Sequence, residues 1–198
     1  MVDLDYPFSE TAVRALKAGD VVRISGTIHT GRDMLHKYFA DGGEFHVDFK
    51  DGALFHCGPV VVKTTAGWRV VAAGPTTSIR ENAYEPGFIR ATGVRLIIGK
   101  GGMDSATLAA MQECGCVYIQ AVGGAAAVAA AAVKRVSGVD FLEEFGPAEA
   151  CWHFEVDGLK GIVAMDTHGK SLFTDVAKYS RRQMDILTQP MSSKGKKK

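Results

Sequence analysis

The chain has 198 residues, of which 46% are hydrophobic and 23% charged, and its formal net charge is +1 at pH 7. This size and balance predict a soluble globular domain, and the near-neutral charge gives no indication of a nucleic-acid-binding protein. The sequence contains no apolar run of about 18 residues and no signal-peptide pattern in its acidic start, MVDLDYPFSE. We therefore expect a cytoplasmic protein with no membrane contact.

Capping residues and hydrophobic periodicity predict alternating helices and strands along the first half of the chain. A helix follows the N-cap residue Ser9, DVVRISGTIHT reads as a strand, and GRDMLHKYFADGG reads as an amphipathic helix that ends at two glycines. Two β-like runs, ALFHCGPVVVK and GWRVVAAGP, come next, and the pattern from Ser78 to Arg90 is helical.

The second half continues the alternation. The expected elements are a strand in VRLIIGKGG, a helix in MDSATLAAMQECG capped by Asp104 or Ser105, a strand in CVYIQAVGG, a helix in AAAVAAAAVKRV, two strands joined at Asp157-Gly158 in CWHFEVDGLKGIVAMDTHG, and a final helix in SLFTDVAKYSRRQMDIL. This interleaving predicts an α/β fold with a mixed sheet flanked by helices. We expect residues 1–190 to form one domain and residues 191–198 to be a disordered basic tail.

The turn GPTTSIREN, Gly74 to Asn82, is the first candidate for a functional site. Ser78 and Glu81 have the spacing of a capping box, which would put Arg80 in the first turn of a helix and Thr76 and Thr77 just before it. A cation at a helix N-terminus opposes the helix dipole, whereas a bound anion would reverse the sign of that interaction. The pattern leaves two interpretations open, a plain capped helix and an anion site.

Two further stretches have a similar arrangement. In SGTIHTGRD a strand runs into a loop that contains His29, and Arg32 then opens a helix, with Ser25 or Thr30 as a possible cap. In GKGGM, Lys100 follows a buried strand, at the strand end where open α/β sheets bind ligands. The glycines permit close approach of a small ligand, although the P-loop pattern is absent.

The alanine-rich stretch and the cysteines give no comparable indication of a functional site. AVGGAAAVAAAA lacks the third glycine of a dinucleotide turn, so we expect its small residues to serve helix packing. The four cysteines, Cys57, Cys114, Cys116 and Cys151, form no CxxC pair and have no metal-ligand spacing with histidine. We expect them to be buried or incidental thiols and expect no metal site in this chain.

SGTIHTGRD, GPTTSIR and GKGGM, in this order, resemble the β subunit of class I, iron–sulfur-dependent fumarate hydratases and of the related L(+)-tartrate dehydratases. AVGGAAAVAAAAV and EEFGPAEACWHFEV are similar to the same family, so the resemblance extends from about Ser9 to Phe173. It implies a swivelling β/β/α-type domain. It also implies a partner α subunit that binds a 4Fe-4S cluster through three cysteines, in an expected α2β2 heterotetramer, with the active site between the subunits.

The resemblance also implies roles for single residues. Arg32 and Arg80 match residues that bind the substrate carboxylates, Thr76 matches the threonine proposed as the base, and Lys100 matches the lysine of the glycine loop. We include Thr77 and His29 as further substrate-binding candidates because they lie in the same stretches.

The implied reaction accounts for these residue types. Malate dehydration removes a weakly acidic C3 proton, so negative charge grows on the adjacent carboxylate, and fixed cations stabilise it. The partner's cluster would act as the Lewis acid for the departing hydroxyl. We expect fumarate as substrate, with tartrate or mesaconate as alternatives. A non-catalytic dicarboxylate-binding module and a nucleotide-binding α/β protein are the competing classes.

Overall fold

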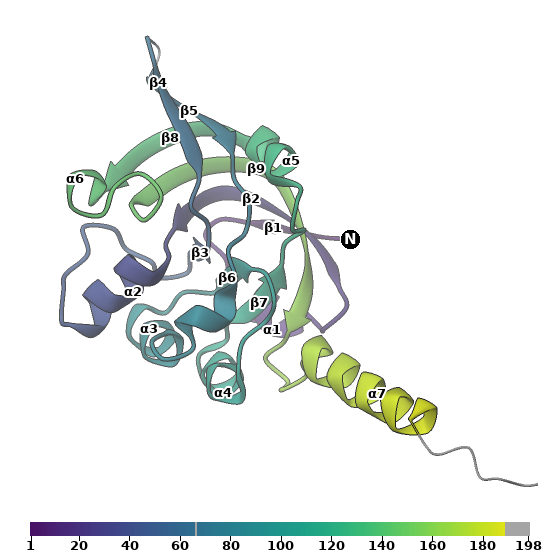
Figure 1. Cartoon of the computed structure of the whole chain (residues 1–198). Coiled ribbons are helices and arrows are strands. Elements are labelled where there is room, and N and C mark those ends of the chain that lie inside the picture. The colour runs from purple at the N-terminus through teal and green to yellow at the C-terminus, as the bar shows by residue number, and fades with distance from the viewer. Residues whose placement is uncertain (66, 189–198) are drawn as a thin grey trace, which may run out of the picture.

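The computed structural model describes residues 1–65 and 67–188, and it has a mixed α/β fold (Figure 1). The expected basic tail, residues 191–198, lies outside the described residues. The strands are β1 (Val2–Asp5), β2 (Val21–Thr30), β3 (Ala53–Phe55), β4 (Val60–Thr64), β5 (Gly67–Ala72), β6 (Leu96–Gly99), β7 (Val117–Gln120), β8 (Val133–Asp140) and β9 (Cys151–Met165). The helices are α1 (Glu10–Ala15), α2 (Asp33–Ala40), the 3-10 helix η1 (Ser78–Glu81), α3 (Glu85–Thr92), α4 (Ser105–Cys114), α5 (Ala126–Ala132), α6 (Leu142–Phe145) and α7 (Leu172–Leu187).

The main sheet closes on itself. Its strand order is β1-β2-β3-β6-β7-β9-β8, and an additional antiparallel pairing between β2 and β9 joins β2, β3, β6, β7 and β9 into a closed, barrel-like ring. The strands β2, β3, β6 and β7 are parallel to one another, so their carboxyl ends lie at one end of the ring, and β9 runs antiparallel to β2 and β7. The antiparallel hairpin β4–β5 stands apart and projects from the body in Figure 1.

Alternation along the short strands divides the core in two, because successive side chains of a strand face opposite sides. In β3, for example, Leu54 packs in a cluster with α3 and α4, whereas Phe55 packs in a second cluster with α1, α5 and the β4–β5 hairpin. Figure 1 shows α2, α3 and α4 grouped on one side of the sheet and α7 extending away from it. None of the described helices is long and apolar enough to cross a membrane.

The structure confirms the α/β class, the mixed sheet and most of the expected elements. Ser9 caps α1 by accepting the Ala12 N–H at 3.2 Å, and Asp104 caps α4 by accepting the Thr107 N–H at 2.9 Å. The helical pattern from Ser78 to Arg90 is interrupted, however, and splits into η1 and α3. Pro86 lies in the first turn of α3, where it has no N–H to continue a preceding helix.

Two other predictions were wrong. The expected helix AAAVAAAAVKRV ends at Ala132, and Val133 begins β8, where the chain pairs with β9. The expected two strands at Asp157-Gly158 are one strand, β9, that continues past a bulge against β2. Gly158 has a φ of +76°, which lets the extra residue fit without ending the pairing.

Candidate active site

Backbone hydrogen bonds bring the three candidate stretches together at the carboxyl ends of the parallel strands. The Thr76 N–H donates to the His56 carbonyl at 2.7 Å, and the Lys100 N–H donates to the Thr76 carbonyl at 3.2 Å. Ser78 N–H in turn donates to the Lys100 carbonyl at 3.0 Å. Residues 76–78 therefore lie between the residues that follow β3 and β6, and they are hydrogen-bonded to both.

The GRD stretch joins the same end of the sheet. The Gly31 N–H donates to the Phe55 carbonyl at 3.1 Å, so the chain turns from β2 into α2 beside the end of β3. As expected, Arg32 stands at the start of α2. The expected caps are absent: Thr30 donates its hydroxyl hydrogen to the Ala150 carbonyl at 3.1 Å and accepts the Trp152 N–H at 2.9 Å. Its hydroxyl is thus used across the sheet to β9.

Arg32 is held by the loop before β9. Its Nη1 lies 3.4 Å from Glu149 Oε1 and donates to the Ala148 carbonyl at 3.3 Å. The guanidinium packs directly over Gly58, where a Cβ would lie only 2.4 Å from Arg32 Nη1. A glycine at this position is therefore required for the observed placement of Arg32, and the sequence analysis did not single it out.

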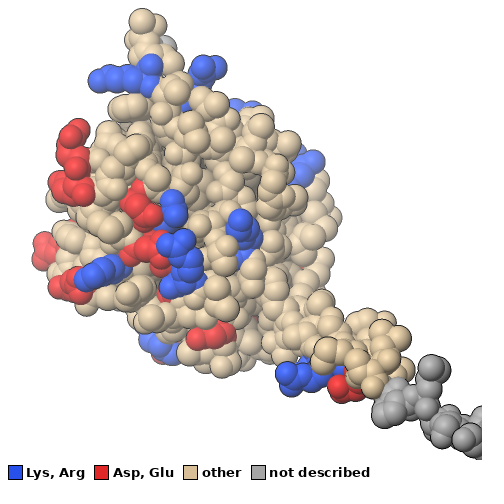
Figure 2. Space-filling view, in the orientation of Figure 1, with Lys and Arg blue, Asp and Glu red and all other residues tan. Residues whose placement is uncertain are grey.

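The other two cations differ in how they are held. Arg80 contacts the Asp33 carboxylate, the residue directly after Arg32, and its side chain remains 51% exposed. Lys100 is partly buried, and none of the ion pairs among the described residues involves it. Figure 2 shows basic side chains gathered at the centre of this face with acidic ones directly beside them.

Ser78 and Glu81 do not form the predicted capping box. The Ser78 hydroxyl points inward, accepts a hydrogen bond from the Tyr118 hydroxyl at 2.9 Å and lies 2.9 Å from His56 Nδ1. Glu81 is fully buried, with its carboxylate 3.6 Å from His36 Nδ1. The N-cap of η1 is Thr77, which makes no side-chain capping bond. Tertiary partners in the core therefore replaced the local capping pattern.

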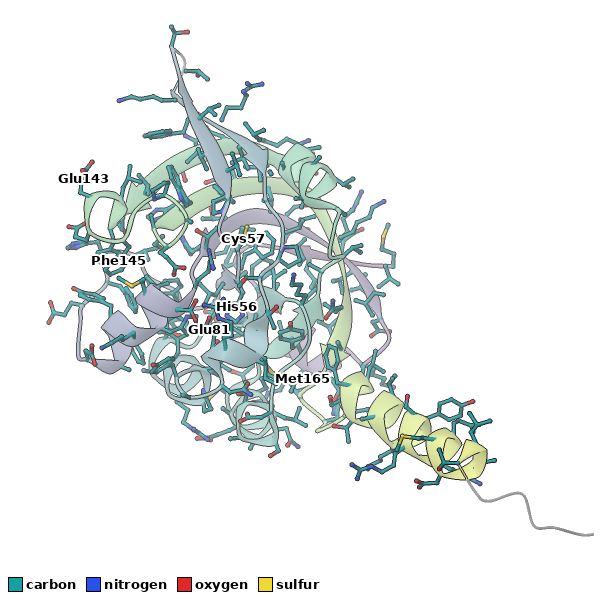
Figure 3. The ribbon with its side chains drawn as sticks, in the orientation of Figure 1. His56, Cys57, Glu81, Glu143, Phe145 and Met165 are labelled. Carbon is teal, nitrogen blue, oxygen red and sulfur yellow. The ribbon has the colours of Figure 1, made fainter. Side chains whose placement is uncertain are left out.

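A buried ionisable network lies directly beneath these segments. Glu85 is fully buried and lies 3.0 Å from His36 Nε2 and 3.1 Å from His56 Nε2. Figure 3 shows His56 and Glu81 at the centre of the molecule, beneath the ends of the strands. The sequence analysis missed His36, His56 and Glu85, and only His56 carried a signal, as an ionisable residue inside the apolar run ALFHCGPVVV.

The charge states of this network follow from burial opposed by pairing. Burial lowers the pKa of His36, but the Glu85 and Glu81 carboxylates outweigh this effect and raise it to about 9. Burial raises the pKa of Glu85, but His36 and His56 outweigh it and lower it to about 2. Burial lowers the pKa of His56 and raises that of Glu81 to about 7. At neutral pH, His36 and Glu85 therefore form a buried ion pair beside a neutral His56.

The network connects all three candidate stretches. His36 Nδ1 lies 2.8 Å from the Arg32 carbonyl, and His56 contacts Ser78 in the TTSIR segment. The Tyr118 hydroxyl donates to Ser78 and accepts the Gly102 N–H of the glycine loop at 3.4 Å. The segments that carry Arg32, Arg80 and Lys100 are thus fixed from below by side-chain hydrogen bonds.

His29 is placed differently from the expectation. It belongs to β2, not to a loop, and it is only 4% exposed. Its ring packs edge-on against Phe49, with the centroids 5.3 Å apart, and against His153 at 4.9 Å. Burial, followed by the nearby His153, lowers the pKa of His29 to about 4, so the ring is neutral. Its predicted role in substrate binding stays a prediction.

The cysteines do not fit a cluster that needs three thiolates from one chain. Cys57 belongs to one core cluster, and Cys116 and Cys151 belong to the other. Among the described residues, the groups of three or more potential metal ligands contain at most one cysteine. The residues present here therefore offer no ligand set for a 4Fe-4S cluster.

Fold and site together define an α/β domain that gathers three cations at the carboxyl ends of a barrel-like sheet. The profile of the family described as "Fumarase C-terminus" matches residues 1–176, and the chain belongs to this family. It is 46% identical over 194 residues to a Geobacillus stearothermophilus protein named provisionally as a fumarate hydratase class I. That match covers 98% of this chain but only 37% of the relative, so the chain spans little more than a third of that protein.

Other relatives match over nearly their full length. A Methanocaldococcus jannaschii protein, named provisionally as an L(+)-tartrate dehydratase subunit beta, is 39% identical, and the match covers 88% of this chain and 94% of the relative. The L(+)-tartrate dehydratase subunit beta of Escherichia coli strain K12 is 32% identical, with 94% of this chain and 93% of the relative covered. Domains of this family therefore occur both as separate subunits and within longer chains.

Proposed function

We propose that this chain is the substrate-binding β subunit of a two-subunit iron–sulfur hydro-lyase that reversibly hydrates fumarate to L-malate. The observation that carries the proposal is the convergence of Arg32, Thr76, Arg80 and Lys100 at one end of the sheet. A swivelling β/β/α type of domain is part of the proposal and is supported by the mixed sheet with its adjoining helices.

Arg32 and Arg80 would bind the two carboxylates of the substrate. Each guanidinium has five N–H donors in a planar fork, so it can keep its internal carboxylate partner and still offer donors to a ligand. Glu149 and Asp33 would then set the orientation of Arg32 and Arg80 before the substrate arrives. Such preorganised groups stabilise a developing carboxylate charge by about 3 kcal/mol each.

Thr76 would remove the C3 proton. Its backbone N–H donates to the His56 carbonyl at 2.7 Å, and its carbonyl accepts the Lys100 N–H at 3.2 Å. These two hydrogen bonds fix the backbone position from which the Thr76 side chain extends. A threonine hydroxyl can act as a base only if nearby cations favour its ionised form, and Lys100 and Arg80 are the candidates. Thr77 adjoins it and is included as a substrate contact.

The cluster and the departure of the hydroxyl are assigned to a partner α subunit. This is supported by the lack of a three-cysteine ligand set in this chain and by the subunit names of the tartrate relatives. It is also supported by the openness of the candidate site, where Arg80 is 51% exposed and the adjacent Ile79 is 57% exposed. We expect an α2β2 assembly that covers this face.

The substrate choice rests on the relatives. The 46% identity to the fumarate hydratase favours fumarate, whereas the match in length to the tartrate dehydratase subunits favours L(+)-tartrate as the second candidate. Pockets discriminate such small substituents by only about 1–3 kcal/mol, so we expect side activities, including on mesaconate.

Anaerobic reconstitution with the iron–sulfur partner tests the proposal. The isolated chain should be colourless and inactive, and the assembled enzyme should hydrate fumarate faster than it dehydrates tartrate or hydrates mesaconate. Substantial turnover by this chain alone would refute the two-subunit proposal. If the assembled enzyme prefers tartrate, L(+)-tartrate replaces fumarate as the proposed substrate. Binding of dicarboxylates by the chain without turnover in any assembly would support the non-catalytic module instead.

A further inference from the structure

Four side chains with metal-binding atoms lie on one face of the sheet, where β2, β9 and β8 pair. His153 lies directly opposite His29 in the β2–β9 pairing, and Cys151 lies directly opposite Asp140 in the β8–β9 pairing. Cys151 and His153 are two residues apart in β9, so they share a face. Side chains directly opposite each other in a sheet have Cβ atoms about 4.5–5.5 Å apart, which brings all four together.

Three of the four side chains have ligand atoms near one another, and Asp140 adjoins this group through His153. One ligand atom each from His29, Cys151 and His153 lies within 4.8 Å of the others. His153 Nε2 is 3.3 Å from Asp140 Oδ2. Bonds of about 2.0–2.3 Å to a tetrahedral zinc ion place ligand atoms roughly 3.3–3.8 Å apart. Binding would therefore draw the His29, Cys151 and His153 atoms closer together and turn the Asp140 carboxylate from His153 toward the ion.

Their hydrogen-bonding potential is also unused. His29 is only 4% exposed, and its buried Nδ1 has no hydrogen-bond partner among the described residues. Within the same described part of the chain, His153 Nε2 and Asp140 Oδ2 also lack a well-aligned hydrogen bond. Buried polar atoms are normally paired, so unpaired ones on the adjoining strands β2, β9 and β8 leave a place for a ligand that these side chains share.

We propose that His29, Asp140, Cys151 and His153 bind a divalent metal ion of the zinc type. The set of one thiolate, two imidazoles and one carboxylate suits a borderline-soft ion and is unsuited to calcium or magnesium, which prefer oxygen ligands. Binding displaces the Cys151 thiol proton to solvent. The side chains of Asp140 and His153 are each 20% exposed, which provides a route for the ion to enter.

The position of this site gives it a structural consequence. His29 is three residues before Arg32 in the chain, and Cys151 is two residues after Glu149, the carboxylate partner of Arg32. A metal ion would therefore join β2, β8 and β9 directly behind the Arg32–Glu149 pair. The sequence analysis predicted no metal site, because only Cys151 and His153 of these four residues are near each other in the chain.

Cobalt(II) titration of the chelator-treated, untagged chain tests the proposal independently of any catalytic activity. We expect one equivalent of Co²⁺ to produce the visible bands of a tetrahedral site and a thiolate-to-cobalt charge-transfer band, and Zn²⁺ to remove both. Zn²⁺ should also raise the melting temperature. Cys151→Ser should abolish the charge-transfer band, whereas Cys116→Ser, a change of an equally buried thiol, should keep it.

His153→Gln and Asp140→Asn provide variants at partly exposed positions, which keeps the test valid if Cys151→Ser does not fold. Each should weaken Zn²⁺ binding by about tenfold or more. A lack of stoichiometric binding would overturn the proposal. So would binding that survives His153→Gln and Cys151→Ser but is lost in His36→Gln, because it would assign the ion to the buried His36–His56–Glu85 group instead.

Discussion

Replacing Glu85 with glutamine should reveal how strongly the buried network supports the candidate site. Glu85 is the only carboxylate among the described residues within 4.0 Å of both His36 and His56, at 3.0 and 3.1 Å. Glutamine keeps the size of the side chain but removes the charge that stabilises protonated His36. Breaking a buried ion pair by removing one partner costs about 3–5 kcal/mol, because His36 must then either stay charged without this partner or lose its proton. For a chain of this size that corresponds to a fall in melting temperature of roughly 6–20 °C.

The same variant should change the pH dependence of stability. In the native chain the pKa of His36 is about 9, above its usual value of 6.5, so between these values the folded state holds a proton that the unfolded state has released. The free energy of unfolding should therefore decrease with rising pH in this window, by about 1.4 kcal/mol per pH unit at most. Glu81, with a pKa of about 7 against a usual 4.5, contributes a decrease of the same sign at lower pH. Glu85→Gln should reduce the decrease between pH 7 and 9, and Glu81, 3.6 Å from His36 Nδ1, should retain part of it.

Urea unfolding at pH 7, 8 and 9, followed by circular dichroism, measures both effects. Glu113→Gln is the matched control, because Glu113 pairs with Arg90 on the surface. The Glu113 side chain is 60% exposed and that of Arg90 is 45% exposed. In that variant the free energy of unfolding should fall by about 1 kcal/mol or less and should keep its dependence on pH. If Glu85→Gln behaves like Glu113→Gln at every pH, then His36 is neutral in the native chain and the ion pair inferred here does not exist.

Five other substitutions, at four residues, test the site and the packing beneath it. Arg32→Lys and Arg80→Lys should each lower kcat/KM of the assembled enzyme by roughly 10²-fold, because lysine keeps the charge but not the two-point contact; near-normal kinetics in both would remove the arginines from the site. Thr76→Ala should abolish exchange of the malate C3 proton with solvent while substrate binding persists, and Thr76→Ser should keep part of the activity; near-native exchange in the alanine variant would mean that another group is the base. Gly99→Ala should destabilise the chain by about 1–3 kcal/mol or more in urea unfolding, because its Cβ would lie 2.0 Å from Ser78 Oγ, and unchanged stability would contradict this packing.

Periodicity and turn residues predicted most of the elements correctly, because those signals act within a few residues of the chain. Ser9 and Asp104 cap their helices as expected, since an N-cap bond joins residues three apart. Where a local signal competed with the core, the core prevailed. Ser78 and Glu81 have capping-box spacing, but both side chains turn inward to Tyr118 and His36. For these two side chains, the contacts made in the core stabilise the fold more than a solvent-exposed capping bond would.

The sequence by itself determined the family resemblance and the identity of Arg32, Thr76, Arg80 and Lys100 as candidates, since these depend on residue types in order along the chain. Only the tertiary structure decided that the sheet closes through β2 and β9, and that these candidates meet above the His36–Glu85 pair. It alone also brought His29 next to His153. Strand pairing joins residues more than a hundred positions apart, and no periodicity within the chain encodes which strands become neighbours.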